Sequence, residues 1–302
     1  LSNWITLNEP QCFIGLGHLS GEHAPGLKLG FDETLIVAHN VLLSHGRAVD
    51  TIRSRAKTTP RVGVAPVGVV KMPAGESKEN IELARSEMFA VKNRDFWNHS
   101  WLGDPMILGH YPEDGLKLFG KDMPDFPAAD MDQICRPLDF YGINLYFPEY
   151  IVEEDGRLIH CMGGGLHGAD NQFTALGWPV KPEAIYWGLR FLYERYQLPM
   201  VITENGLANI DWPSMDGAVH DPQRIDFMNR YLGQVGRSLE EGIDVRGYFS
   251  WTLMDNFEWS LGYRPRFGLI HVDYPTQTRT LKDSAKWYSN VIESNGSCLG
   301  VQ

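Results

Sequence analysis

The stretch VITENG at residues 201–206 is a short β-branched run that ends in a carboxylate and an Asn-Gly turn. A run of this length, closed by a turn signal, is typical of a buried strand. The stretch WITLNEP at residues 4–10 has the same organisation, with an amide and a carboxylate at its end. The sequence therefore predicts two strands that each present an acid, Glu9 or Glu204, at the carboxyl end.

Segments of this kind alternate with amphipathic helical segments along the whole chain. We expect strands at residues 4–8, 61–67, 138–145, 200–204 and 245–251. We expect helices at residues 31–55, 77–96, 182–196, 222–241 and 283–294. Residues 71–77 and the Pro-, Asp- and Gly-rich residues 105–137 are expected to be surface excursions. The alternation predicts a parallel sheet covered by helices, either doubly wound or closed as a barrel.

Two features favour the barrel. A doubly wound nucleotide-binding sheet carries a glycine-rich phosphate loop after an early strand, and no such loop follows residues 4–8 or 61–67. A barrel instead gathers functional polar side chains at the carboxyl ends of several strands. We therefore predict an α/β fold of the (β/α)8, or TIM-barrel, type.

Composition argues against several other classes of protein. The 302-residue chain has 27 Lys and Arg against 38 Asp and Glu, a net charge of −11, which disfavours a nucleic-acid binder. No apolar run approaches the roughly 18 residues of a membrane helix. The four cysteines are scattered, which favours a reduced, cytoplasmic setting. The histidines lack metal-ligand spacing. We expect no nucleic-acid or membrane partner, no metal and no cofactor.

The stretch SWTLMDNFEW at residues 250–259 indicates what the strand ends could bind. A tryptophan face can stack on a sugar ring, and a carboxylate can accept hydrogen bonds from two neighbouring hydroxyls. The nine tryptophans could instead fill the core, and the strand-end acids could be surface carboxylates. Tryptophans beside acids at strand ends favour a polyol substrate. Two carboxylates that flank an acetal are the minimal machinery for glycoside cleavage, and their separation decides between retention and inversion.

These motifs, in this order, resemble the signatures of family 1 glycoside hydrolases, the β-glucosidase family. The resemblance rests on TLNEP at residues 6–10, ITENG at residues 202–206 and residues 250–263, and it extends over essentially the whole chain. It implies a (β/α)8 barrel and a retaining double displacement through a glycosyl-enzyme.

The resemblance also implies a role for individual residues. Glu9 matches the general acid/base and Glu204 matches the nucleophile. Asn8 matches the amide that binds the sugar 2-hydroxyl. Tyr146, two residues after Asn144, matches the phenol that donates to the nucleophile. Glu9 and Glu204 are therefore the predicted catalytic residues, and Asn8, Asn144 and Tyr146 are predicted to bind the substrate beside them.

A second group of matched residues would hold the substrate. Trp251, Glu258 and Trp259 match the platform under the terminal sugar, with Glu258 bridging the 4- and 6-hydroxyls. Trp178 matches an aromatic on the aglycone side, and the alternative to this role is a core tryptophan before a helix. Phe267 resembles a further wall of the sugar site.

The implied activity is a retaining β-glycosidase that hydrolyses terminal, non-reducing β-D-glucosyl residues of β-glucosides or oligosaccharides such as cellobiose. β-Galactosidase or β-fucosidase activity would accompany it, and an alcohol in place of water would give transglycosylation. A 6-phospho-β-glycosidase is disfavoured because Glu258 would repel a phosphate. The alternative from another class is a non-catalytic sugar-binding remnant.

One departure from the family pattern concerns the length of the barrel. In relatives the NEP strand is the fourth of the barrel, whereas here it is the first predicted strand. We therefore expect residues 1–302 to form a single, N-terminally incomplete catalytic barrel domain with strands 4 to 8, about five of the eight βα units. A longer chain or a second chain would supply strands 1 to 3. In the family, that absent part carries hydroxyl-binding residues and an arginine near the nucleophile.

Overall fold

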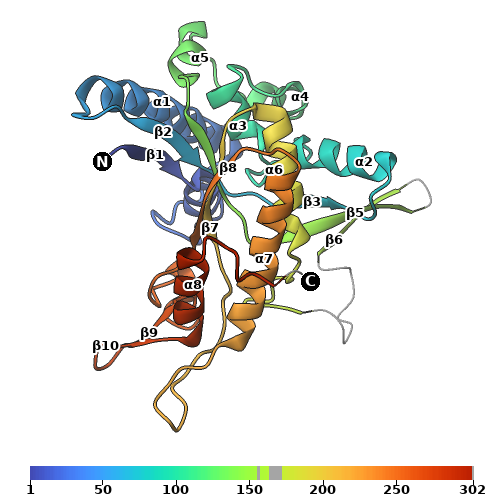
Figure 1. The fold of residues 1–302 in the computed structure, drawn as a ribbon. Helices are drawn as coiled ribbons and strands as arrows, with labels where there is room; N and C mark the ends of the chain where they lie inside the picture. Colours follow the sequence, from blue (N-terminus) through green and yellow to red (C-terminus); the bar gives the residue numbers. More distant parts are fainter. Residues whose placement is uncertain (155–156, 163–171, 301–302) are drawn as a thin grey trace.

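Five parallel strands form the central sheet of the molecule (Figure 1). The computed structural model describes residues 1–154, 157–162 and 172–300. Within them the strands are β1 (Asn3–Asn8), β2 (Arg61–Ala65), β4 (Phe140–Asn144), β7 (Met200–Asn205) and β8 (Val245–Ser250). They lie side by side in the order of the chain, β1-β2-β4-β7-β8, and every neighbouring pair is parallel. The expected strands are therefore confirmed, with ends that differ by one or two residues.

Helices connect these strands and cover the sheet. The main ones are α1 (Phe31–Arg55), α2 (Lys78–Phe89), α6 (Glu183–Tyr196), α7 (Pro222–Glu240) and α8 (Asp283–Glu293). Leu42 of α1, Ile143 of β4 and Leu189 of α6 belong to one buried apolar cluster, which places the core between helices and sheet. The expected helix at residues 77–96 ends earlier, because the chain leaves helical geometry at Ala90.

The expected surface excursion at residues 105–137 is wrong in part. Residues 105–107 form the end of α3 (Ser100–Ile107). The rest of the segment contains α4 (Glu113–Phe119), η2 (Gly120–Asp122) and α5 (Ala128–Ile134). Phe119 is buried with its ring 4.5 Å from that of Trp101 and 4.8 Å from that of Phe31 on α1. The aromatic residues scattered through this segment anchor it to the core, despite its Pro- and Gly-rich composition.

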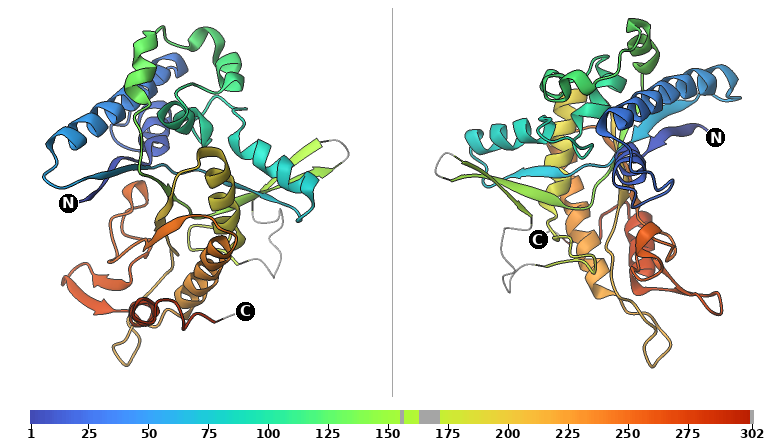
Figure 2. Two further views of the ribbon diagram at one scale, coloured as in Figure 1. Left: turned by 45° about the horizontal axis from the view of Figure 1, so that its top comes forward. Right: turned by 180° about the vertical axis from the view of Figure 1, so that it is seen from behind.

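Two smaller sheets flank the central one. Residues 71–77, expected to be a surface excursion, overlap strand β3 (Val70–Pro73), which pairs with β5 (Pro148–Glu154). Strand β6 (Arg157–Met162) completes that sheet. After β8, the strands β9 (Ile270–Asp273) and β10 (Thr278–Leu281) form a hairpin. Figure 2 shows this hairpin and α8 at the opposite end of the molecule from α1.

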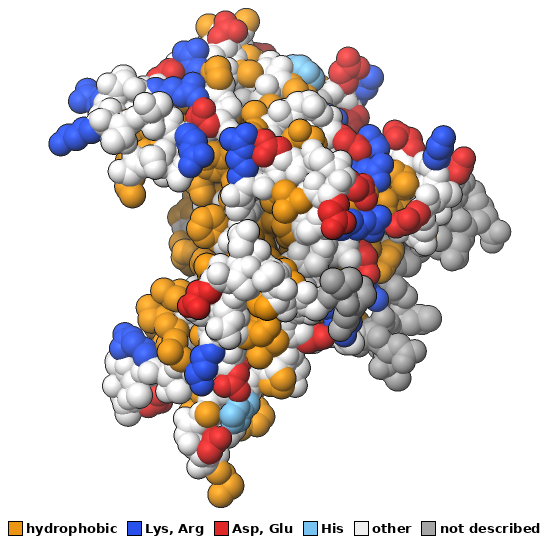
Figure 3. Space-filling model, viewed as in Figure 1, with side chains coloured by type: hydrophobic (Ala, Val, Ile, Leu, Met, Phe, Trp, Pro, Cys, Tyr) orange, Lys and Arg blue, Asp and Glu red, His pale blue; other side chains and the backbone are white. Residues whose placement is uncertain are grey.

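The central sheet is open, with β1 at one edge and β8 at the other. A hollow of about 290 Å³ is lined by residues of all five strands, including Ile5 of β1, Val201 of β7 and Phe249 of β8. Ile5 is 45% exposed and Phe249 is 61% exposed. Figure 3 shows hydrophobic side chains gathered at the waist of the face in view. No helix among the described residues is long and apolar enough to cross a membrane.

Candidate active site

The predicted site residues gather in one cavity of about 410 Å³. Nine of the ten line it: Asn8, Glu9, Tyr146, Trp178, Glu204, Trp251, Glu258, Trp259 and Phe267. The tenth, Asn144, is buried and donates a hydrogen bond to Glu9. The cavity lies at the carboxyl ends of the sheet strands, since Glu9 follows β1, Glu204 is in β7 and Trp251 follows β8. This is the edge at which a parallel barrel builds its active site.

Glu9 is held in an unusual backbone conformation with φ of +45°. This left-handed region costs a non-glycine residue about 1–3 kcal/mol and persists only where the surroundings impose it. Here the Glu9 N–H donates to the carbonyl of Ala65 at the end of β2 (2.8 Å), and the Cys12 N–H donates to the carbonyl of Glu9 (2.9 Å). These bonds fix the turn that aims the carboxyl group into the cavity.

The Glu9 side chain has a donor on each oxygen. Nδ2 of Asn144 donates to Oε1 across 2.9 Å, and the Cys12 thiol donates to Oε2 across 3.1 Å. Cys12 begins the π-helical segment η1 (Cys12–Ser20). Cys12 is not among the site residues predicted from the sequence, although its position three residues after Glu9 is the spacing at which side chains meet on a helical turn.

Glu204 is partly buried, and its carboxylate lies near enough to Glu9 for the two negative charges to interact. Burial is the main cause that raises its pKa to about 7, and the negative charge of Glu9 adds to the effect. Hydrogen bonds from Tyr146, Asn144 and Asn8 oppose the rise. The Tyr146 hydroxyl donates to Oε2 of Glu204 across 2.7 Å. Burial also raises the pKa of Tyr146 well above its usual range, so this phenol stays a donor.

Asn144 links the strands that carry the two acids. Its Nδ2 also donates to Oδ1 of Asn8 across 3.1 Å, and its Oδ1 accepts a hydrogen bond from the Thr203 hydroxyl across 2.6 Å. Beside it, the buried Asn205 donates from Nδ2 to the carbonyl of Leu145 across 2.7 Å. Neither Thr203 nor Asn205 is among the site residues predicted from the sequence. Their positions on either side of Glu204 were the available signal.

Gly206 closes the VITENG stretch because a larger residue would not fit. A Cβ atom at this position would lie 1.8 Å from the carbonyl oxygen of Trp251. The Trp251 N–H donates to the carbonyl of Asn205 across 2.9 Å. The close approach places the end of β8, and with it Trp251, directly beside the strand that carries Glu204.

The side chains expected to hold a sugar lie on the β8 side of the cavity. Trp259 is 65% exposed, and Oε2 of Glu258 accepts a hydrogen bond from Nδ2 of Asn256 (2.9 Å). Phe267 is buried, with its ring 6.3 Å from that of Trp178. Trp178 is partly exposed and lines the cavity, so its position does not fit the core-tryptophan alternative.

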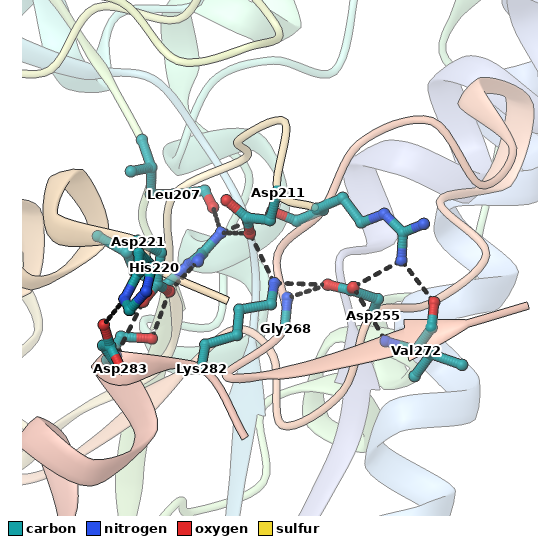
Figure 4. A network of polar contacts seen from close by, with 12 residues as sticks. Leu207, Asp211, His220, Asp221, Asp255, Gly268, Val272, Lys282 and Asp283 are labelled. Carbon is teal, nitrogen blue, oxygen red and sulfur yellow. Dashed lines mark hydrogen bonds and ion pairs between the residues drawn. The ribbon is translucent and has the colours of Figure 1, made fainter. Parts of the chain in front are cut away.

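A buried network of charges supports the loops after β7 and β8 (Figure 4). Nζ of Lys282, which is fully buried, donates to Asp211 across 2.6 Å and to Asp255 across 2.9 Å. Arg224 donates to the same oxygen of Asp211 across 2.8 Å, and Arg266 donates to Asp255 across 2.8 Å. Lys282 thus joins the loop that follows Glu204 to the loop that leads to Glu258.

Asp255 receives further hydrogen bonds from the backbone around the sugar site. Gly268 and Val272 donate their N–H groups to it across 2.9 and 3.3 Å. Asp255 lies three residues before Glu258, and Gly268 directly follows Phe267. The cations Lys282 and Arg266 hold the pKa of Asp255 below its usual range, against the effect of burial. The network therefore fixes both segments that carry the expected sugar-binding side chains.

Comparison with known proteins gives consistent matches. Residues 1–297 match the family model of glycosyl hydrolase family 1. Beta-glucosidase A of Thermotoga maritima is 39% identical over 297 residues, which are 98% of this chain and 64% of that protein. The 1,4-beta-D-glucan glucohydrolase of Thermotoga neapolitana is 38% identical over 297 residues, with the same coverage. A bifunctional beta-D-glucosidase/beta-D-fucosidase of Bifidobacterium breve is 36% identical over 312 aligned positions. The alignment covers 97% of this chain and 65% of that protein.

Solved structures agree with these matches. The family 1 b-glucosidase from Thermotoga maritima in complex with isofagomine lactam superposes with a TM-score of 0.83 at 38% identity. The alignment covers 98% of this chain and 64% of that chain. The prediction of βα units from a TIM barrel is confirmed. The chain spans less than two thirds of the length of these relatives.

Proposed function

Because the chain belongs to glycosyl hydrolase family 1, we propose that its site hydrolyses terminal β-D-glucosides by a retaining double displacement. One observation carries the proposal: two glutamates from different strands, Glu9 and Glu204, face one cavity and are joined through Asn144. Tyr146 and Asn8 complete the arrangement expected of a nucleophile and an acid/base.

The proposed reaction has two steps. In the first, a Glu204 oxygen attacks the anomeric carbon while protonated Glu9 gives its proton to the departing glycosidic oxygen, so that an alcohol leaves and a glycosyl-enzyme remains. In the second, Glu9 takes a proton from water, the water oxygen attacks the anomeric carbon, and Glu204 is released as a carboxylate. An alcohol in place of water gives transglycosylation.

The β8 side of the cavity supplies the proposed sugar recognition. The faces of Trp251 and Trp259 pack against the ring of the terminal sugar, and Glu258 accepts hydrogen bonds from its 4- and 6-hydroxyls. Asn8 binds the 2-hydroxyl. The carboxylate of Glu258 disfavours a 6-phosphosugar because two anions would meet. β-Galactosides, β-fucosides and cellobiose are the further substrates to examine.

Residues 1–302 form, in this proposal, one catalytic domain whose barrel is completed by three further βα units, from a longer chain or a second chain. Open sheet edges and the exposed Ile5 and Phe249 support it, because such edges and apolar faces are normally covered. The free thiols of Cys12, Cys135 and Cys298 fit a cytoplasmic location.

The test is turnover of a chromogenic β-glucoside by a preparation of known intact mass, as the chain alone and after completion with an N-terminal segment of the barrel. The completed protein should be active, and Glu204→Gln should abolish that activity. A 2-deoxy-2-fluoroglucoside should add one glycosyl group to Glu204, detected by peptide mass. Full activity in the Glu204→Gln variant would refute the mechanism. Stoichiometric glucose binding without hydrolysis by the completed protein would favour the sugar-binding alternative.

A further inference from the structure

Strand β7 carries one residue more than its neighbour β4 just before the proposed nucleophile. Two pairs of residues, Ile202 with Ile143 and Glu204 with Asn144, are separated by one residue on β7 and by none on β4. The extra residue is Thr203, at a β-bulge of the kind that turns side chains out of the regular alternation of a strand. Its hydroxyl reaches across to β4 and lies 2.6 Å from Oδ1 of Asn144. The bulge therefore places a hydroxyl beside the amide that links the two glutamates.

This hydroxyl sets the direction of the Asn144 amide. Because the Thr203 hydroxyl donates to Oδ1, the amide nitrogen faces the opposite way. There both of its hydrogens are used, since Nδ2 donates to Oδ1 of Asn8 across 3.1 Å and to Oε1 of Glu9 across 2.9 Å. Asn144 is fully buried, so each of these bonds replaces one to water. The amide thus meets the acid/base with its nitrogen and Thr203 with its oxygen.

A reversed amide would compete with this arrangement whenever Glu9 is protonated. In the proposed first step Glu9 carries the proton for the departing oxygen. If Oδ1 of Asn144 faced Glu9, the carboxylic acid would donate its hydrogen bond to that amide oxygen, and the substrate would have to compete for the proton. In the observed orientation the Thr203 hydroxyl satisfies Oδ1 on the other side. Without this donor the buried amide oxygen would be left unpaired, which is costly, and the reversed orientation would gain population.

We propose that Thr203 is a positioning residue for the acid/base. Its hydroxyl holds the nitrogen of the Asn144 amide toward Glu9, so that the proton of Glu9 is offered to the leaving group. Among the described residues, Thr203 lines the hollow between the strands and is not one of those that line the cavity, so it acts through Asn144. The inference rests on the proposed β-glucosidase function and adds to it a residue that touches no substrate.

The experiment compares Thr203→Val with Thr203→Ser in the completed protein. Valine keeps the branched shape of threonine without the hydroxyl, and serine keeps the hydroxyl. In Thr203→Val, kcat/KM for methyl β-D-glucoside should fall about 10-fold, the loss expected for one hydrogen bond. For dinitrophenyl β-D-glucoside, whose leaving group departs without a proton, kcat/KM should change less than about twofold. Thr203→Ser should recover most of the methyl glucoside value.

A graded set of phenyl glucosides gives a readout that packing alone would not move. Poor proton donation makes the rate depend more steeply on how well the phenol leaves. The logarithm of kcat/KM should therefore fall more steeply with the pKa of the departing phenol in Thr203→Val than in the parent protein. Thr203→Ala, which removes the hydroxyl with a different loss of packing, should show the same steeper dependence. An unchanged slope in both variants would overturn the inference.

Thr51→Val is the matched control. Thr51 is an exposed residue of α1 whose hydroxyl also donates one hydrogen bond, to the carbonyl of Arg47 across 2.8 Å. This variant should leave both kcat/KM values unchanged. An equal loss for both glucosides in Thr203→Val would mean that the hydroxyl serves packing, and would refute the positioning role. If the completed protein turns over no glucoside, the proposed function fails and takes the inference with it; turnover with an unchanged ratio of the two substrates refutes the inference alone.

Discussion

The hydroxyl of Tyr146 donates a hydrogen bond to Oε2 of Glu204 across 2.7 Å, from the segment after β4 to strand β7. The bond favours the ionised carboxylate and fixes its orientation. Tyr146→Phe should therefore lower kcat of the completed protein about 10- to 100-fold, the loss expected for one hydrogen bond to a charged group. Steady-state kinetics with a chromogenic glucoside measures it. Tyr288→Phe on α8 is the matched control, and equal kinetics in the two variants would contradict the role of Tyr146.

The raised pKa of Glu204 predicts a pH dependence of stability. The folded chain binds this proton with a pKa of about 7, against 4.5 in the unfolded chain. Between these values the folded state holds more protons, so stability falls as the pH rises from about 4.5 to 7. The full penalty, ~3 kcal/mol at most, is present above pH 7. Glu204→Gln should raise Tm at pH 8 and change it little at pH 4.5. A Tm difference that is the same at both pH values would exclude this titration.

Cys12 should matter most when the leaving group needs a proton. Burial, and then the charge of Glu9, raise the pKa of its thiol, which keeps it a hydrogen-bond donor to Glu9 Oε2. Cys12→Ala should slow the turnover of methyl glucoside about 10-fold and slow dinitrophenyl glucoside much less, because that leaving group departs without protonation. Cys12→Ser should recover part of the loss.

The matched control for Cys12 is Cys135→Ala, at a free thiol near the end of α5. It should leave the ratio between the two substrates unchanged. An equal loss for both substrates in Cys12→Ala would mean that the thiol serves packing and does not orient Glu9.

Removal of one charge from the buried network should cost stability. Lys282→Met leaves Asp211 and Asp255 with fewer cations in a region closed to water, and breaking a buried pair in this way costs about 3–5 kcal/mol. Urea unfolding followed by circular dichroism measures the change. Lys286→Met, at an exposed lysine of α8 paired only loosely with Asp283 (3.6 Å), should change stability by less than about 0.5 kcal/mol. Similar stabilities for the two variants would contradict the structural role of the network.

The sequence predicts the central strands well because their signal is local. Each is a short β-branched or apolar run with polar residues at its end, so strand ends such as Asn8 and Glu204 could be placed to within a residue or two. The side chains predicted at these strand ends line the cavity. The segment at residues 105–137 could not be predicted in this way, since Phe119 is held by Trp101 and Phe31 in distant parts of the chain.

The contacts that hold the site in place could not be predicted from the sequence either. Lys282 meets Asp211 across 71 residues, and nothing near either residue marks the pairing. Cys12 lies within one turn of Glu9, yet a lone cysteine has no pattern that points to an acid. Contacts between loops depend on the whole fold, whereas strand periodicity does not.

The open sheet, with β1 and β8 as its two free edges, has a practical consequence. A separately produced segment with the remaining strands would have to pair with both edges at once, and each edge lies beside one of the two glutamate-bearing strands or is one itself. Under the proposed function, association of the two pieces would switch on cleavage of a coloured glucoside. The chain would serve as one piece of a split reporter. Two proteins of interest would each be fused to one piece, and their binding to each other would be read as enzyme activity.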